Sequence, residues 1–148
     1  VRECLHQGLE VDSIPGPSSV ITALTLSGLP PDKFLFLGYL PEKPGHRKKL
    51  LEGIKLFHLE GVIRSHLSFT IVVFVAPHKL TRTLEDMKEV YEDIEVTLTH
   101  ELTKIHQSVD TKKISKWLET LKSPKGEYVL LLELRGSSEN HSSLSLIQ

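Results

Sequence analysis

The chain has 148 residues, 39% of them hydrophobic and 25% charged, and its 18 basic and 19 acidic side chains give a formal net charge of −1 at pH 7, a composition typical of one soluble globular domain. A chain of this length buries enough surface for a core without disulfides, and its single cysteine, Cys4, excludes a disulfide-rich secreted scaffold. The apolar runs are far shorter than the roughly 20 residues that cross a bilayer, so we expect no membrane-spanning segment.

The start of the chain predicts helix, strand, tight turn and helix in succession. Residues 1–7 have the pattern of a helix end, and residues 9–14 predict a short strand. The turn Pro15-Gly16-Pro17 stops that strand, because two prolines remove two backbone donors. Ser18 is then a natural N-cap for an apolar helix that runs to Gly28.

Two apolar segments in the middle of the chain predict strands. Residues 34–40 are continuously apolar and bounded by prolines, which is typical of a strand buried on both faces. Residues 70–75 are almost all β-branched or aromatic, and they give the strongest strand prediction. Between these segments, residues 43–49 predict a basic loop that runs into a helix, and residues 56–68 are interpreted as an insertion or a continuation of that helix.

The next segment predicts an amphipathic helix. Residues 80–91 carry an apolar stripe at helical spacing. The remaining face is rich in carboxylates, and we interpret these as exposed to solvent: Glu85, Asp86, Glu89, Glu92 and Asp93.

The last third of the chain completes the predicted sheet. Residues 94–98 and 128–134 predict strands, and Asp110 is the candidate cap of a helix over residues 114–121. Residues 135–148 are polar and serine-rich, which predicts a disordered tail. About five strands interleaved with about four helices predict an α/β fold with a mixed sheet flanked by helices.

The sequence lacks the common local signatures of enzymes. It contains no dinucleotide-binding fingerprint, Walker loop, nucleophile elbow or His-Glu-x-x-His motif. Its eight histidines are scattered, without carboxylates or cysteines at ligand spacing, so we predict no metal site.

Polar groups follow two of the predicted strands, where α/β sheets hold their ligands. Residues 15–19 open a helix, and free backbone N–H groups and two serine hydroxyls there can hold a ligand, although a plain N-cap also explains Ser18. Residues 100–106 combine a carboxylate, a hydroxyl, an ammonium and imidazoles. Together with the basic residues 43–49 they can contact phosphates, but a cluster of surface lysines also serves solubility alone.

Seven short motifs occur in an order that is more specific than any one of them. They are Ile14-Pro15-Gly16-Pro17-Ser18-Ser19, Thr22-Ala23-Leu24, Ser27-Gly28-Leu29-Pro30, Phe34-Leu35-Phe36-Leu37-Gly38-Tyr39-Leu40-Pro41, Pro77-His78-Lys79-Leu80, Glu101-Leu102-Thr103-Lys104 and Lys125-Gly126-Glu127. In this order they resemble the C-terminal part of the tetrapyrrole methylase superfamily, and within it the 16S ribosomal RNA (cytidine 2'-O) methyltransferase branch. The resemblance covers residues 1–134.

This resemblance implies an enzyme of two α/β domains that holds S-adenosylmethionine (SAM) in the cleft between them. Residues 1–14 then match the end of the N-terminal domain and an interdomain strand, and residues 15–134 match the C-terminal methylase domain. The implied activity is methyl transfer to a ribose 2'-hydroxyl of small-subunit ribosomal RNA, and we expect this chain alone to be incomplete and inactive. Two alternatives stay open, namely methylation of a tetrapyrrole and a non-catalytic fragment that folds or dimerises without a cofactor.

The resemblance also assigns candidate site residues. The implied cofactor contacts are Ser18, Ser19, Val75, Leu102 and Thr103. The candidate catalytic residues are Glu101 and Lys104, for which a salt bridge that ties the turn to the sheet is an equally good interpretation. The candidate RNA-binding residues are Lys43, Arg47, Lys48 and Lys49.

The implied partner is small-subunit ribosomal RNA, with no membrane, and a homodimer is left open. Many bacterial members have Tyr-Glu-Ser-Pro-His where this chain has Phe74-Val75-Ala76-Pro77-His78. The loss of that carboxylate and the hydrophobic residue in its place resemble plant members of the branch. We therefore expect the cytoplasm for a bacterial protein, and the chloroplast or mitochondrion for a plant-type one.

Overall fold

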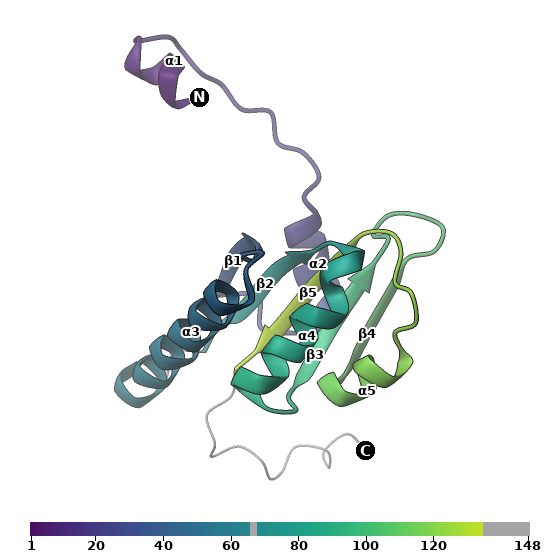
Figure 1. Ribbon diagram of the computed structural model, residues 1–148. Coiled ribbons are helices and arrows are strands. Elements are labelled where there is room, and N and C mark those ends of the chain that lie inside the picture. The colour runs from purple at the N-terminus through teal and green to yellow at the C-terminus, as the bar shows by residue number, and fades with distance from the viewer. Residues whose placement is uncertain (66–67, 135–148) are drawn as a thin grey trace, which may run out of the picture.

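The structure is a computed structural model that describes residues 1–65 and 68–134 (Figure 1). The helices are α1 (Arg2–His6), α2 (Ser19–Ser27), α3 (Pro44–Ser65), α4 (Pro77–Tyr91) and α5 (Ile114–Thr120). The strands are β1 (Phe34–Tyr39), β2 (Thr70–Val75), β3 (Glu95–His100), β4 (Ser108–Lys113) and β5 (Tyr128–Glu133). The predicted tail over residues 135–148 lies outside the described residues.

The five strands form one mixed sheet in the order β1-β2-β5-β3-β4, which confirms the predicted α/β class. β1 pairs with β2 in parallel, and the other pairs are antiparallel. β5 therefore lies between β2 and β3, although it follows both in the sequence (Figure 1). Its burial from Val129 to Leu132 follows from this central position, because it has a neighbour on each side and helices over both faces.

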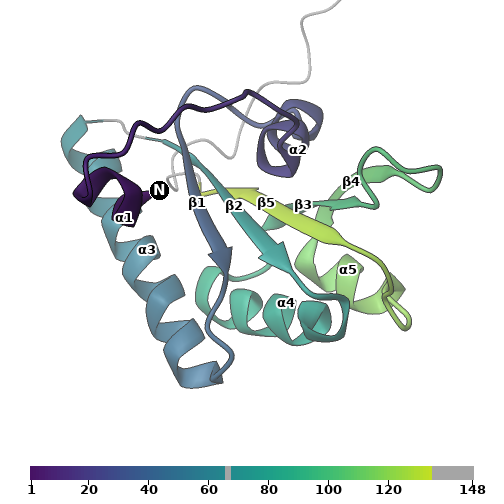
Figure 2. The ribbon, with the colours of Figure 1, turned by 90° about the horizontal axis from the view of Figure 1, so that it is seen from above.

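Helices cover the two faces of the sheet unequally. α2 lies over one face, and α4 and α5 lie over the other, with α3 beside α4 (Figure 2). On the face of α4 and α5, alternate residues of β2 and β5 join the larger core: Ile71, Val73, Val75, Leu130 and Leu132. The intervening residues Val72, Val129 and Leu131 form a smaller core with Ala23 and Leu24 of α2. The alternation along each strand thus divides the core in two.

β1 is an edge strand, so the prediction that it is buried on both faces is wrong. Leu35 and Leu37 pack against the larger core. Phe34 and Phe36 point to the other face and remain 41% and 43% exposed. α2 covers β5 on that face rather than the edge of the sheet, which leaves these rings uncovered (Figure 2).

β4 was not predicted, and it corrects the role of Asp110. Asp110 lies within β4, opposite Leu98 of β3, so it does not cap α5. That role falls to Asp93, whose carboxylate accepts hydrogen bonds from the backbone N–H of Ser115 at 2.7 Å and from its hydroxyl at 2.8 Å. These bonds lower the pKa of Asp93. The pairing of β3 with β4 brings Asp93 to the start of α5.

The segments on either side of the first motif also differ from expectation. Residues 9–14 form no strand, because no neighbouring strand pairs with them, and Leu9 and Ile14 are exposed. α1 buries none of its residues and lies away from the sheet (Figure 1).

Residues 56–65 continue α3, as one of the two interpretations held. Within the described residues, no helix is both long and apolar enough to cross a membrane.

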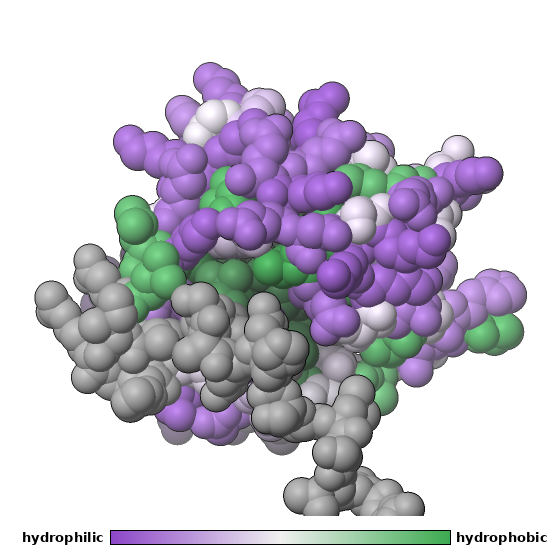
Figure 3. Space-filling model, turned by 90° about the horizontal axis from the view of Figure 1, so that it is seen from below, coloured by the Kyte–Doolittle hydropathy of each residue, from purple (hydrophilic) through white to green (hydrophobic). Residues whose placement is uncertain are grey.

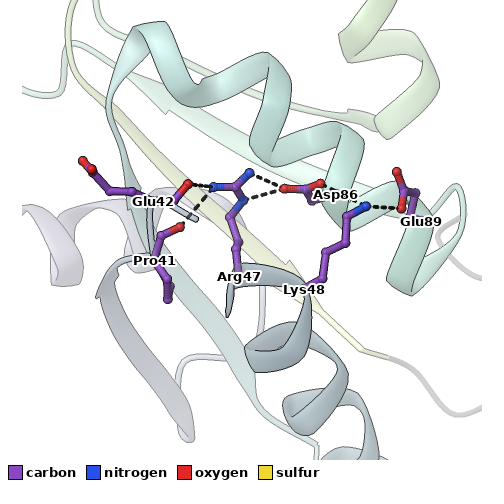
Figure 4. Close-up of polar contacts among 6 residues, drawn as sticks. All are labelled: Pro41, Glu42, Arg47, Lys48, Asp86 and Glu89. Carbon is purple, nitrogen blue, oxygen red and sulfur yellow. Dashed lines mark hydrogen bonds and ion pairs between the residues drawn. The ribbon is translucent and has the colours of Figure 1, made fainter. Parts of the chain in front are cut away.

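A buried ion pair joins α3 to α4 (Figure 4). Arg47 is 3% exposed and Asp86 is 5% exposed. The Nε of Arg47 donates to Oδ2 of Asp86 at 2.6 Å, and its Nη1 donates to the carbonyl oxygens of Pro41 and Glu42, each at 3.0 Å. The guanidinium therefore fixes the loop after β1 as well as the two helices.

This pair corrects two predictions made from the sequence. Residues 44–49 belong to α3 and are not a flexible basic loop. Asp86 is not part of a solvent-exposed face, since it lies between Arg47 and Lys48. Lys48 also pairs with Glu89, so the N-terminal turns of α3 are bound to α4 by several charges.

The surface leaves apolar side chains uncovered. Seen from below, the described surface is mainly hydrophilic, but a hollow in its middle exposes hydrophobic residues (Figure 3). Large hydrophobic side chains are also exposed on α2 and α3, including Ile21, Leu26, Leu56 and Phe57. The smaller core under α2 is thus less completely enclosed than the larger one.

We predict that Asp86→Ala lowers the free energy of unfolding by about 3–5 kcal/mol, because it leaves the buried guanidinium of Arg47 without its counter-charge. Urea unfolding followed by circular dichroism measures this loss. The exposed neighbour Glu85 is the control, and Glu85→Ala should change stability by less than about 0.5 kcal/mol. A loss below about 1 kcal/mol for Asp86→Ala would show that the pair does not hold α3 to α4.

Candidate functional site

The loops that bear the predicted site residues gather at one edge of the sheet, the edge that is formed by the ends of the strands and not by an outer strand. β1, β2 and β3 all run in the same direction, so their carboxyl ends meet at the edge where β5 begins. The turn after β3, the loop before β5 and the start of α2 lie there together. Such edges of α/β sheets are the usual place for ligands.

A cavity of about 400 Å³ lies at this edge. It is lined by the start of α2, the ends of β1 and β2, the turn after β3 and the start of β5, through Pro17, Ser18, Ser19, Thr22, Tyr39, Phe74, Leu102, Thr103, Lys104, Glu127, Tyr128 and Val129. Five of the residues predicted to bind cofactor or to act in catalysis therefore line one cavity: Ser18, Ser19, Leu102, Thr103 and Lys104.

The other two predicted residues do not line this cavity. Val75 is buried in the larger core, on the face of α4. Its neighbour Phe74 points to the opposite face and lines the cavity instead, because side chains alternate along a strand. Glu101 lies in the wall behind the cavity, where its carboxylate accepts a hydrogen bond from the backbone N–H of Glu127 at 2.9 Å.

The start of α2 offers free polar groups to the cavity. Ser18 occupies the N-cap position, with extended backbone at φ −134° and ψ 122°, yet its side chain makes no capping hydrogen bond. The first N–H groups of a helix have no partner within the helix. The plain N-cap interpretation of Ser18 is therefore incomplete, because its hydroxyl leaves those donors to another acceptor.

Charges in the turn after β3 are already paired. Lys104 lies 3.0 Å from a carboxylate oxygen of Glu127 and 3.2 Å from one of Glu101. The hydrogen bonds that Lys104 donates to Glu127 and Glu101 raise the pKa of Lys104. The backbone N–H of Glu127, followed by Lys104, lowers the pKa of Glu101. At neutral pH the site thus holds an ammonium and a carboxylate, and neither is a good proton acceptor.

Close backbone packing fixes the same turn. Gly126 has φ +83°, and a Cβ atom there would lie 2.5 Å from Oε1 of Glu101 and 2.8 Å from Nε2 of His100. That Nε2 donates a hydrogen bond to the carbonyl oxygen of Lys125, 2.9 Å away. The His100 ring stacks on Tyr128, with ring centroids 4.6 Å apart. The loop before β5 therefore packs directly against the end of β3.

Several lining residues had no predicted role. Tyr39, Phe74, Glu127 and Tyr128 line the cavity, but sequence spacing does not show which strand end each one reaches. Lys125-Gly126-Glu127 was recognised as a motif without a function. The left-handed conformation of Gly126 and its contact with Glu101 give that motif a physical reason.

The predicted RNA-binding residues lie apart from the cavity, around the start of α3. Lys43 and Lys49 are exposed. Arg47 is buried against Asp86, and its guanidinium cannot reach a phosphate while that pair holds. Lys48 is partly exposed and pairs with Asp86 and Glu89. Among the described residues, no group of three histidine, cysteine, aspartate or glutamate side chains is placed to hold a metal ion.

We predict that Gly126→Ala destabilises the turn after β3, because a Cβ would collide with Glu101 at a position that also requires a positive φ. Hydrogen exchange of the amides of Glu101 and Glu127 should accelerate at least tenfold, and the melting temperature should fall by several degrees. Gly53→Ala in α3 is the control, since nothing lies within 4 Å of a Cβ there. Unchanged exchange in Gly126→Ala would disprove the role of this contact.

Comparison with known proteins identifies the family of the chain. The family model of Tetrapyrrole (Corrin/Porphyrin) Methylases matches residues 1–117. The chain is 37% identical over 134 residues to Ribosomal RNA small subunit methyltransferase I of Thermotoga maritima. The aligned region covers 89% of this chain and 55% of that protein. It is 34% identical over 150 aligned positions to the protein of the same name from Haemophilus influenzae, with 98% and 50% covered. The chain thus spans about half the length of the curated relatives it matches.

The fold also matches solved structures. The crystal structure of the methyltransferase CobJ superposes with a TM-score of 0.53 at 19% sequence identity, covering 88% of this chain and 53% of that one. This likeness concerns the fold, and the family rests on the match over residues 1–117. The resemblance of the ordered motifs is confirmed, and the chain belongs to the Tetrapyrrole (Corrin/Porphyrin) Methylases family.

Proposed function

We propose that this chain supplies one wall of the active site of a SAM-dependent methyltransferase that acts on a ribose 2'-hydroxyl of small-subunit ribosomal RNA. One observation carries the proposal. The pairs Ser18–Ser19 and Leu102–Thr103, far apart in the sequence, line a single cavity at the edge of the sheet. The names of the relatives support ribosomal RNA as the substrate.

The lining of the cavity suits SAM. The free N–H groups at the start of α2 and the Ser18 hydroxyl can bind its polar groups. The apolar surfaces of Phe74, Leu102 and Tyr39 suit an adenine ring. When bound, SAM supplies an electrophilic methyl group on a sulfonium.

The chain's own residues contribute mainly by positioning. Holding donor and acceptor in line lowers the barrier to a displacement by several kcal/mol. Glu101 fixes the turn through the N–H of Glu127 and through Lys104, so we assign it a positioning role. Lys104 remains protonated at the wall of the cavity, where its charge favours an anionic group of the cofactor or of the RNA.

The proposal retains Lys43 and Lys49 as phosphate contacts. Both are exposed near the start of α3, which follows the carboxyl end of β1. Arg47 has a structural role instead, because it is buried against Asp86. The proposed substrate places the protein where small ribosomal subunits are made, in the bacterial cytoplasm or, for a plant-type member, in the chloroplast or mitochondrion.

We predict that Ser19→Leu abolishes SAM binding in a protein that joins this chain to the upstream part of the Thermotoga maritima relative. A leucine side chain would fill the cavity beside the free N–H groups of α2. Calorimetric titration with SAM measures the affinity, and thermal unfolding without SAM should shift by less than about 2 °C.

Ser18→Ala is the matched variant at the neighbouring position. Because Ser18 makes no capping hydrogen bond, its loss should cost less than about 0.5 kcal/mol of stability. Its affinity for SAM should fall modestly, by a factor of about 5, as expected for one lost hydrogen bond. Normal SAM binding and normal methyl transfer by Ser19→Leu would refute the site. Transfer to a tetrapyrrole but not to ribosomal RNA would favour the alternative substrate.

We predict that Lys43→Ala with Lys49→Ala weakens RNA binding to a similar extent for different sequences, because phosphate contacts carry no base information. The slope of log affinity against log salt should become less steep by about 1.4 for two contacts with a single strand. Fluorescence anisotropy over a salt series measures both effects. An unchanged slope would leave these lysines as solvated surface.

A further inference from the structure

A second cavity lies on the other side of the turn after β3. Its volume is about 460 Å³, and it is an open depression bordered by the end of β3, the β3–β4 turn and the loop between α5 and β5. The side chains that give it chemical character are His100, His106, Lys122, Ser123, Lys125 and Tyr128. Neither lysine is among the predicted site residues, whereas His100 and His106 end the segment 100–106 that the sequence offers for phosphate contact.

The charge in this cavity is mainly positive. Lys122 and Lys125 contribute two ammonium groups, and within residues 1–65 and 68–134 no carboxylate forms an ion pair with either. Glu101 also lies in the wall, but its carboxylate already accepts the backbone N–H of Glu127 and pairs with Lys104. The two lysines therefore remain available to an anion.

The loop that carries these lysines is fixed in place. Lys122 follows directly after the C-cap of α5, Leu121. The carbonyl oxygen of Lys125 accepts the hydrogen bond from His100, and Gly126 packs against Glu101. Both ends of the loop are thus anchored, which lowers the entropy lost when an anion binds.

The two cavities share a wall. Tyr128 lines both of them, and the turn formed by Glu101 and its neighbours separates them. A chain molecule with one unit at the mouth of the first cavity, beside the cofactor, can therefore lay an adjoining unit on the second. In RNA that adjoining unit is a phosphodiester.

We propose that the second cavity binds the phosphodiester backbone of the RNA strand whose ribose meets the SAM methyl group at the mouth of the first cavity. This assignment rests on the proposed function. It names Lys122 and Lys125 as phosphate contacts and Ser123 as a neutral hydrogen-bond donor. Phosphate contacts of this kind set register along the strand and do not read its sequence.

An exposed apolar residue beside the cations favours RNA over an acidic peptide. Ile105 is 97% exposed at the tip of the β3–β4 turn, next to His106 in the sequence. An RNA strand presents bases, which have flat apolar faces, as well as phosphates. A run of acidic residues, such as polyglutamate, presents carboxylates without flat apolar faces.

The experiment uses this 148-residue chain and a fluorescently labelled single-stranded RNA from the small ribosomal subunit. Anisotropy titrations over a salt series compare the parent with Lys122→Ala/Lys125→Ala. The control is Lys88→Ala/Lys116→Ala, which removes the same charge. Lys88 lies in the last turn of α4 and Lys116 in the first turn of α5, which places both near the opposite edge of the sheet.

We expect the Lys122/Lys125 variant to lose affinity about tenfold or more at ~0.1 M salt, with a slope shallower by about 1.4. The Lys88/Lys116 variant should stay within twofold of the parent. Equal slopes for the two variants would overturn the proposal and leave the methyltransferase function standing. Displacement of the RNA by polyglutamate at equal charge would overturn the assignment to RNA.

A separate measurement distinguishes failure of the proposed function. Methyl transfer to RNA is assayed with the protein joined to the upstream part of the relative. If that protein transfers no methyl group, while Lys122→Ala/Lys125→Ala still weakens RNA binding selectively, the proposed function fails and the phosphate site stands.

Discussion

The position of β5 in the middle of the sheet determines the rest of the molecule. β5 follows β2 and β3 in the sequence but pairs with both, in antiparallel register from Thr70↔Glu133 to Val75↔Tyr128 on one side. Its side chains alternate between the two cores, with Leu130 and Leu132 in the larger core and Val129 and Leu131 in the smaller one. Without β5 the sheet would be two separate pairs of strands, and neither pair has a complete core.

The same strand builds the site. Its first residues, Tyr128 and Val129, line the cavity together with Glu127, which directly precedes the strand and meets the turn after β3. The contact between Gly126 and Glu101 sets how closely the two segments approach. Glu101 then acts through the backbone of Glu127 and the charge of Lys104. Glu101, a candidate catalytic residue in the sequence, thus connects two walls of the cavity, which is the basis of the positioning role that we propose for it.

Ion pairing decides which basic residues are available to a ligand. Arg47 and Lys48 are held by Asp86 and Glu89, because α3 packs against α4. Lys104 is shared between two carboxylates. The number of basic residues in the segment 43–49 is therefore larger than the number that is free to bind a ligand. Charge counted along the sequence also overlooks Lys122, and it gives no role to Lys125, which the sequence marks only as part of the motif Lys125-Gly126-Glu127.

The sequence by itself determined the α/β class, four of the five strands in the described residues, and two of the segments that line the first cavity, since hydrophobic periodicity and the ordered motifs are local properties. Only the tertiary structure decided the rest. β4 is mainly polar, so its pairing with β3 has no apolar signal. The exposure of β1 follows from its place at the edge. The burial of Asp86 and the alternation that turns Val75 away from the cavity depend on neighbours far away in the sequence, which no local pattern encodes.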